Sequence, residues 1–403
     1  MKAVMYGGGN IGRGFIGMLL SQSGYDVTFV DVVDAVVNRL NEEHCYPVRI
    51  ISSDGYEDVK VERVSAVNGN DQAATAKAIA GCNIMAMAVG VNILKFIISN
   101  LVAGIRLRRE QGGGPLNILI CENLMDANKV LEGMLKEELI EEEIAWFDEN
   151  IGLVEVSIGR MVPVQTEEMK DGDPLRVCVE SYGFLPADKA AFKGGVPEIK
   201  NMVPFEPFDF YIKRKLYVHN MSHATCAYLG LYTGKDYIYQ SIDDADTELI
   251  VSNAMTESTM ALSAKYGVPL EELVKHTQDL LRRFTNSALK DTCKRVGGDP
   301  KRKLSPADRL IGSSRTCMEQ GICPAYISVG TAGAVYEYLV ENELPQTREN
   351  ALEVLRTVSG LTDDEELTAI VLRLYELYQS GADIRTIRHL AAKIRAEHAE
   401  QVI

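Results

Sequence analysis

The sequence lacks most of the features that mark secreted, membrane or metal-dependent proteins. In its 403 residues, no apolar run reaches the length that crosses a membrane. The chain enters an apolar strand pattern at its second residue, so we expect no signal peptide and a cytoplasmic protein. No two of its eight cysteines have Cys-x-x-Cys spacing, and several lie in apolar segments. We therefore expect reduced thiols instead of a disulfide framework.

Patterns that bind metals are equally scarce. There are six histidines, at positions 44, 219, 223, 276, 389 and 398. They form no His-Glu-x-x-His motif and no cluster with cysteine. Only His219 and His223, four residues apart, could share a metal ion, and we favour the absence of a metal.

Positive charge is also in short supply. The chain has 42 lysines and arginines against 57 aspartates and glutamates, a net charge of −15. This balance disfavours nucleic acids and anionic membranes as partners. An acidic or phosphorylated substrate would therefore need a local basic cluster.

A glycine-rich loop stands at the start of the chain. The apolar strand pattern at 2–6 is followed by GGGNIGRGFIG and then by an apolar helical pattern. Gly7 permits a tight turn, Gly9 lets the backbone approach a pyrophosphate, and Gly12 lets helix and strand pack closely. The free N–H groups of the helix N-terminus then face the phosphates. We assign this dinucleotide-binding loop to Gly7, Gly9, Asn10, Ile11 and Gly12.

Further cofactor contacts are expected where later strands end. Asp31 ends a second strand pattern 19 residues after Gly12, where a carboxylate binds the ribose 2′-hydroxyl, so the cofactor should be NAD and not NADP. Val89 and Gly90 follow another strand, and Glu122 and Asn123 follow NILIC. Asn123 could equally be a helix N-cap.

The two halves of the chain differ in their patterns. Strand patterns at 2–6, 27–31, 83–89, 116–121, 152–157 and 177–183 alternate with helical ones at 12–22, 33–43, 91–109 and 123–138. This alternation predicts a doubly wound parallel sheet of Rossmann type, a dinucleotide-binding domain over 1–195. Residues 196–403 should form a mainly α-helical substrate and catalytic domain, with helices at 206–230, 243–266, 269–294, 305–320, 322–343, 347–358, 363–379 and 383–400.

Three chemistry-bearing residues lie close together in KRKLYVHNMSHA. At about 100° per residue, one helical face can carry Lys215, His223 and Asn220. In a hydride-transfer enzyme, Lys215 would be the general base, and Asn220 and His223 would donate hydrogen bonds to the substrate oxygen. The alternatives are a solvated basic helix face, or His219 in place of His223. Tyr211 and Lys215 also form the Tyr-x-x-x-Lys pair of short-chain dehydrogenases, which we disfavour because the glycine spacing differs.

One basic run stands out in this acidic chain. DPKRKLSPADR carries the cations Lys301, Arg302, Lys303 and Arg309. A substrate phosphate would suit this run, and we expect Arg302 and Lys303 to be the leading contacts. The alternative is a solvated loop.

Taken together, these motifs resemble the polyol-specific long-chain dehydrogenases over essentially the whole chain. The resemblance rests on the glycine loop, Asp31, the CEN run at 121–123, RKLYVHNMSHA, and RKLSPADRLI at 302–311. It implies that Lys215, Asn220 and His223 are catalytic, and that the reaction is the metal-independent, NAD-dependent interconversion of mannitol 1-phosphate and fructose 6-phosphate. The rival functions are a dehydrogenase of an unphosphorylated polyol such as mannitol, or of a hexonate, and an NAD(H)-binding redox sensor without catalysis.

Overall fold

The chain folds into two compact units, Met1–Asp209 and Phe210–Ile403. The structure, a computed structural model, describes residues 1–124 and 126–402. None of the helices in these described ranges is long and apolar enough to cross a membrane.

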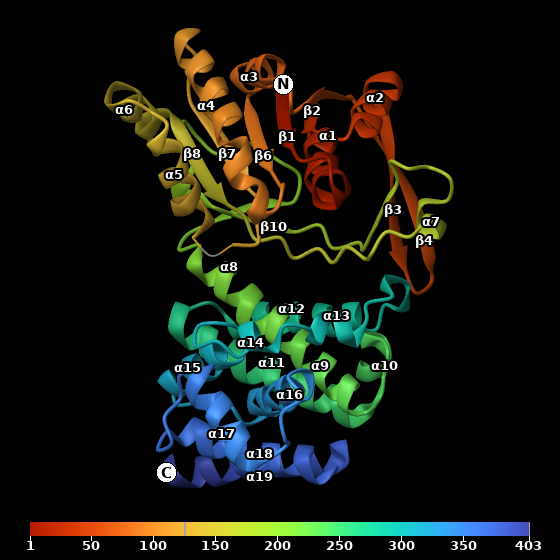
Figure 1. Ribbon diagram of the computed structural model, residues 1–403, viewed down its shortest axis with the longest axis vertical. Coiled ribbons are helices and arrows are strands. Elements are labelled where there is room, and N and C mark those ends of the chain that lie inside the picture. Colours follow the sequence, from red (N-terminus) through yellow and green to blue (C-terminus); the bar gives the residue numbers. More distant parts are fainter. Residues whose placement is uncertain (125, 403) are drawn as a thin grey trace. The chain divides into compact units, whose positions relative to one another are not determined.

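The first unit is built on a six-stranded parallel sheet (Figure 1). Its strands are β1 (Lys2–Tyr6), β2 (Asp26–Asp31), β5 (Val64–Asn68), β6 (Ile84–Met87), β7 (Leu116–Ile120) and β8 (Ile151–Glu155). They lie in the order β5-β2-β1-β6-β7-β8, so the strand order reverses beside β1. The predicted doubly wound, Rossmann-type sheet is confirmed.

Helices cover both faces of this sheet because successive side chains of a strand point to opposite sides. Ala3 and Met5 of β1 lie in one core, with residues from π-helix η1 (Gly12–Gly17) and α1 (Met18–Gln22). Val4 and Tyr6 lie in the other core, with residues from the helices of the opposite face. Those helices include α3 (Gln72–Ala80), α4 (Leu94–Glu110) and α5 (Ala127–Glu137) (Figure 1). The helix expected over 123–138 includes residue 125, which lies outside the described residues.

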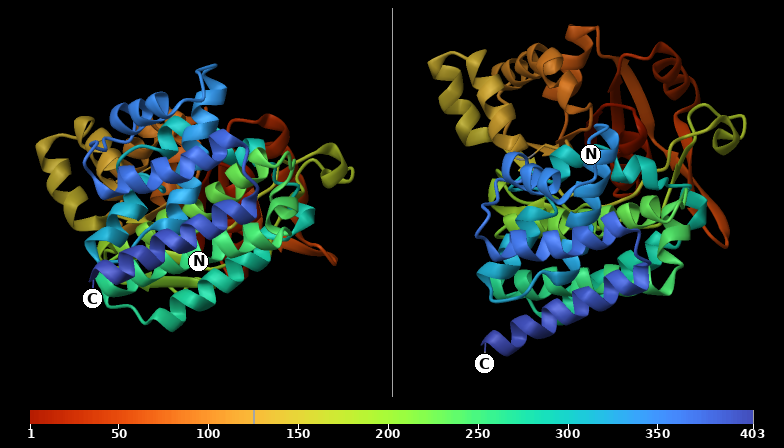
Figure 2. Two further views of the ribbon diagram at one scale, coloured as in Figure 1. Left: turned by 90° about the horizontal axis from the view of Figure 1, so that it is seen from below. Right: turned by 60° about the horizontal axis from the view of Figure 1, so that its bottom comes forward.

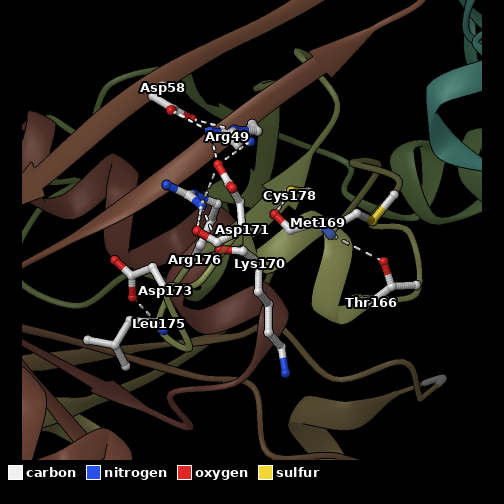
Figure 3. A network of polar contacts seen from close by, with 10 residues as sticks. All are labelled: Arg49, Asp58, Thr166, Met169, Lys170, Asp171, Asp173, Leu175, Arg176 and Cys178. Atoms are coloured by element: carbon white, nitrogen blue, oxygen red, sulfur yellow. Dashed lines mark hydrogen bonds and ion pairs between the residues drawn. The ribbon is translucent and has the colours of Figure 1, made fainter.

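A smaller sheet was missed by the sequence patterns. The hairpin β3 (Cys45–Ser52) and β4 (Gly55–Glu62) is joined in parallel by β9 (Val177–Val179). The segment before β9, which includes α7 (Glu167–Lys170), is held to the hairpin by a polar network (Figure 3). In it, Arg49 donates to both carboxylate oxygens of Asp58, at 2.7 and 2.8 Å, and contacts Asp171 at 3.4 Å.

The first unit continues past residue 195, where the sequence suggested a boundary. Strand β11 (Met202–Phe205) pairs in parallel with β10 (Leu185–Asp188), which belongs to the first unit. The remaining elements of this unit are α2 (Asp34–Glu43), η2 (Val91–Ile93), α6 (Glu141–Asn150) and η3 (Lys189–Ala191).

The second unit is helical, as predicted. Helix α16 (Ala325–Glu341) lies at its centre and contacts α9 (Met221–Tyr232), α11 (Ala245–Tyr266), α18 (Glu366–Ser380) and α19 (Ile384–Val402). Figure 2 shows α19 as one long helix along a side of this unit. The other elements are α8 (Asp209–Lys213), η4 (Arg214–Asn220), α10 (Ile238–Ile242), α12 (Leu270–Phe284), η5 (Ser287–Leu289), α13 (Cys293–Gly297), α14 (Pro300–Lys303), α15 (Ile311–Glu319) and α17 (Arg348–Thr357).

Candidate functional site

The glycine-rich loop follows β1 directly. Gly7 has a φ of +99°, and a Cβ atom there would overlap the carbonyl oxygen of Ala88. A Cβ atom on Gly12 would overlap the carbonyl oxygen of Gly7, because helix and strand meet closely. Gly9, in contrast, would have no heavy atom within 4 Å of a Cβ. Asn10 and Ile11 begin the helix, whose first N–H groups have no intrahelical acceptors. The loop thus leaves open space above Gly9, as a pyrophosphate requires.

Asp31 lies beside this loop at the end of β2. Its Oδ2 accepts a hydrogen bond from the N–H of Gly8 at 2.7 Å, and its Oδ1 accepts one from the N–H of Val33 at 2.9 Å. On the other side, buried Arg13 donates from Nε to the carbonyl oxygen of Gly8 at 2.6 Å. Asp31 therefore both orders the loop and presents a partly exposed carboxylate next to it.

Glu122 connects the ends of two neighbouring strands. Its carboxylate accepts hydrogen bonds from the N–H of Val89 at 2.7 Å and of Gly90 at 2.9 Å. Gly90 has a φ of +91°, which favours glycine. The structure thus brings together three of the residues expected to contact the cofactor, and Glu122 has a clear structural task in holding the 89–90 turn. Asn123, which follows it, is exposed.

In the second unit, Lys215 and Asn220 lie in a π-helix and not in the α-helix that the angular argument assumed. η4 spans Arg214–Asn220 and continues into α9. Because hydrogen bonds in a π-helix close between residues five apart, Asn220 lies about one turn from Lys215. The carbonyl of Tyr217 accepts a hydrogen bond from Ser258 Oγ of α11 at 2.8 Å, which secures the wide turn from outside.

Lys215 has an environment suited to a general base. Burial, and secondarily the charge of Arg309, lower its pKa to about 8. Within the described residues, neither the Lys215 ammonium nor the Asn220 amide has a hydrogen-bonding partner. Both groups are therefore available to a substrate oxygen.

The two neighbouring histidines differ in their surroundings. The ring of His223 stacks on Phe284, with centroids 4.8 Å apart, and its Nε2 lies 3.3 Å from Asp291 Oδ2. His219 is buried, and its ring centroid is 6.0 Å from that of His223. Burial, and secondarily the charge of Arg283, hold the pKa of His219 well below its usual range. His223 is therefore the better candidate for contact with a substrate.

The four cations of the basic run divide into two pairs. Lys301 and Arg302 are exposed, and Arg302 donates to Asp299 at 2.9 Å. Lys303 is 3% exposed, and burial, with the charge of Arg309 as the second cause, lowers its pKa to about 8.

Arg309 thus acts electrostatically on both Lys303 and Lys215. Tyr217, two residues after Lys215, donates to the carbonyl oxygen of Ala307 at 3.2 Å and so ties this segment to η4. Buried Lys303 and partly buried Arg309 are thus linked electrostatically to Lys215 through Arg309, whereas Lys301 and Arg302 are exposed.

Sequence reasoning missed the segment that follows α12. A helix was expected over 269–294, but α12 ends at Phe284, and short turns carry Phe284 and Asp291 to the histidines. The sequence signals were an asparagine and a serine at 286–287 and an aspartate before Thr292, which are residues that favour turns and helix caps. In the described part of the chain, His, Cys, Asp and Glu form no group of three that could hold a metal ion.

Comparison with protein families covers nearly the whole chain. Residues 1–201 match the Mannitol dehydrogenase Rossmann domain, and residues 208–402 match the Mannitol dehydrogenase C-terminal domain. The mannitol-1-phosphate 5-dehydrogenase of Thermoanaerobacter pseudethanolicus is 35% identical over 382 residues, which cover 94% of this chain and 97% of that protein. A protein of the same name from Brevibacillus brevis is 36% identical over 377 residues, covering 92% and 96%.

Solved structures agree in fold. A substrate-free D-sorbitol dehydrogenase has a TM-score of 0.80 at 15% identity, with 95% of each chain covered. The mannitol 2-dehydrogenase of Pseudomonas fluorescens, in a ternary complex with NAD and D-mannitol, has a TM-score of 0.74 at 15% identity, covering 97% of this chain and 94% of that one. At this identity the two structures support the fold alone.

Proposed function

The chain belongs to the mannitol dehydrogenase family, and from this premise we propose that it interconverts mannitol 1-phosphate and fructose 6-phosphate with NAD. The observation that carries the proposal is the identity of 35% and 36% to two mannitol-1-phosphate 5-dehydrogenases, over 94% and 92% of this chain. The described residues of each unit supply one part of the chemistry.

The first unit fits NAD. Open space above Gly9 and the free N–H groups of the helix after it suit a pyrophosphate. The carboxylate of Asp31 suits a ribose 2′-hydroxyl and repels a 2′-phosphate, so we propose NAD as the preferred cofactor. Val89, Gly90 and Asn123 are proposed as further contacts, and Glu122 keeps the 89–90 turn in place. When bound, NAD supplies the hydride acceptor.

The second unit carries the acid–base chemistry. In the oxidative direction, neutral Lys215 accepts the proton of the substrate hydroxyl as the adjacent carbon loses its hydride. Asn220, about one turn away, donates a hydrogen bond to the same oxygen as it becomes a carbonyl. Burial favours the neutral amine, which is the form that a base requires.

Lys303 and Arg309 are proposed to bind the substrate phosphate. A buried cation is costly unless an anion pairs with it, and Lys303 has no hydrogen-bonding acceptor among the described residues. Among the described residues, the guanidinium of Arg309 has a hydrogen bond only from its Nε, to Asp308 at 2.8 Å, so its other nitrogens are available. A phosphate would therefore offset the charge of both side chains.

The decisive experiment follows NADH absorbance with fructose 6-phosphate or unphosphorylated fructose as substrate. We expect rapid NADH oxidation with fructose 6-phosphate and a much higher KM for fructose. Preference for fructose or for a ketohexonate would replace the proposal with the unphosphorylated-polyol or hexonate alternative. NADH binding without turnover of any of these ketones would favour the redox sensor.

A further inference from the structure

Two different contacts fix the orientation of the His223 imidazole ring. Stacking on Phe284 at an interplanar angle of 16° fixes the plane of the imidazole. The contact of Nε2 with Asp291 Oδ2 at 3.3 Å fixes the rotation of the ring within that plane. Both side chains of the pair are largely buried, at 13% exposure for His223 and 10% for Asp291, so water competes little for the contact.

Asp291 is itself anchored on both sides. Arg295 donates to Asp291 Oδ1 from Nε at 2.8 Å, one turn along the chain. The carbonyl oxygen of Asp291 accepts a hydrogen bond from the N–H of Ile238 at 2.9 Å, and Thr292 caps helix α13. The carboxylate thus has little freedom to follow a movement of the imidazole, and the imidazole must align with it.

The ionisation state of Asp291 decides which proton the ring carries. Burial alone would raise the pKa of Asp291, but its contacts with His223 and Arg295 hold it below its usual value. An ionised carboxylate accepts hydrogen bonds and donates none, so Nε2 of His223 must carry the hydrogen. In a neutral imidazole, Nδ1 then has a lone pair and is an acceptor.

We propose that Asp291 is a positioning residue that holds Nε2 of His223 and leaves Nδ1 to accept a hydrogen bond from a substrate hydroxyl. The inference rests on the proposed function, since it concerns the polyol substrate of the same site. A polyol has a hydroxyl on the carbon next to the one that reacts. The O–H of that hydroxyl can donate a hydrogen bond to Nδ1. Asn220 then donates to the reacting oxygen, and His223 takes a role opposite to the donor role that the sequence suggested.

The tautomer of His223 tests the first half of this inference without any turnover. The protein is labelled with ¹⁵N-histidine, and the two ring nitrogens of His223 are identified by the signals that His223→Gln removes. We expect the neutral ring of the substrate-free wild type to carry its hydrogen on Nε2 and none on Nδ1. A neutral ring with its hydrogen on Nδ1, or a ring that stays charged throughout the pH range of activity, would overturn the proposal. This result also stands apart from the proposed function, which fails only if fructose 6-phosphate is not reduced.

A double-mutant cycle tests whether Asp291 acts through His223. Asp291→Asn keeps the shape of the side chain and should lower kcat/KM about 10- to 100-fold, as loss of the group that orients a histidine typically does. In a His223→Ala background, the same substitution should cause no further loss. A further loss of equal size would mean a merely structural role and would contradict the proposal.

Asp246→Asn is the matched control for this cycle. Asp246 is a partly buried carboxylate of the same unit that pairs with Arg388, and it contacts no imidazole in the described residues. Its substitution should leave kcat/KM near the wild-type value. If Asp291→Asn does not fold, which its melting curve would reveal, the tautomer measurement on the wild type still decides the inference.

Discussion

Lys215 illustrates how a single residue acquires its chemistry from its surroundings. Its sequence neighbours Lys213 and Arg214 look like parts of a solvated basic face. Burial nevertheless lowers the pKa of Lys215 to about 8, close to the pH at which a general base must switch between its two forms.

This pKa predicts opposite pH profiles in the two directions of the reaction. Oxidation of mannitol 1-phosphate needs the neutral amine, so its rate should rise as the pH increases through about 8. Reduction of fructose 6-phosphate needs the ammonium, so its rate should fall over the same range. Initial rates measured in both directions across this range check the prediction. Profiles that move in the same direction would remove Lys215 from the role of base, as would a Lys215→Ala variant with wild-type turnover.

The contacts of Asp31 predict how its substitution changes cofactor affinity and the preference for NAD over NADP. Because its carboxylate also accepts hydrogen bonds from Gly8 and Val33, Asp31→Ala should weaken NADH binding by about 1–3 kcal/mol as well as relax the preference for NAD over NADP. Asp31→Asn retains an oxygen acceptor but not the charge, and should relax the preference with a smaller loss of affinity. Fluorescence titrations with NADH and NADPH measure both effects. Equal affinity of the wild type for the two cofactors would refute this role of Asp31.

At the scale of elements, each of the two units has a π-helix among its proposed functional residues. η1 (Gly12–Gly17) follows the glycine-rich loop, and η4 (Arg214–Asn220) carries Lys215 and Asn220. A π-helical turn leaves carbonyl groups without their usual partners and therefore persists where other contacts compensate or where function requires it. In η4 the compensation comes from Ser258 and Ser313, which both donate to the carbonyl oxygen of Tyr217.

Helix α9, which continues directly from η4, packs closely on α16. A Cβ atom on Gly330 of α16 would overlap Thr225 Oγ1 of α9, and one on Gly333 would lie 2.9 Å from Tyr228 Cβ. Gly330→Ala should therefore displace α9 or strain it, lowering both the melting temperature and kcat. Over-packing of this kind costs about 1–3 kcal/mol.

Gly133→Ala is the matched control for that packing prediction. Gly133 lies in α5, and a Cβ atom there would have no heavy atom within 4 Å. The same substitution should stabilise the protein by up to about 1 kcal/mol, because alanine favours a helix more than glycine does. Equal effects of the two substitutions on melting temperature would show that α9 and α16 are not closely packed.

At the scale of the whole molecule, a net charge of −15 repels a phosphorylated substrate. Binding must then depend on a few local cations, and Arg309 acts electrostatically on both Lys215 and Lys303. The sequence favoured Arg302 and Lys303 as the phosphate contacts. On the structure, we instead propose Lys303 and Arg309.

A ranking of four substitutions tests this assignment. Lys303→Met and Arg309→Gln should raise the KM for fructose 6-phosphate about 10- to 150-fold, which corresponds to a charge-assisted bond of roughly 1.5–3 kcal/mol. Lys301→Gln and Arg302→Gln should have much smaller effects, because both side chains are exposed. The KM for fructose should change little in all four. The reverse ranking would restore the exposed pair as the phosphate site.

The sequence by itself determined the features that depend on local spacing. The glycine loop, the position of Asp31 and the alternation of strands and helices predict a parallel sheet with a dinucleotide site, because each follows from the backbone needs of a few adjacent residues. The spacing of Lys215, Asn220 and His223 likewise placed them in one helical segment. The hairpin β3–β4 was missed because its strands pair outside the main sheet and carry mixed polar and apolar residues.

Only the tertiary structure decided which of these residues share an environment. The pKa of Lys215 depends on burial and on Arg309, which lies 94 positions later (309 − 215), and the orientation of His223 depends on Asp291. The helical pattern of the sequence predicted one helix over 269–294, but α12 ends at Phe284 and the chain turns there. Contacts with the histidines outweigh local helix propensity at this point. Burial and electrostatic interactions act through space. They can be predicted from sequence spacing only when the interacting residues lie on one helix or strand.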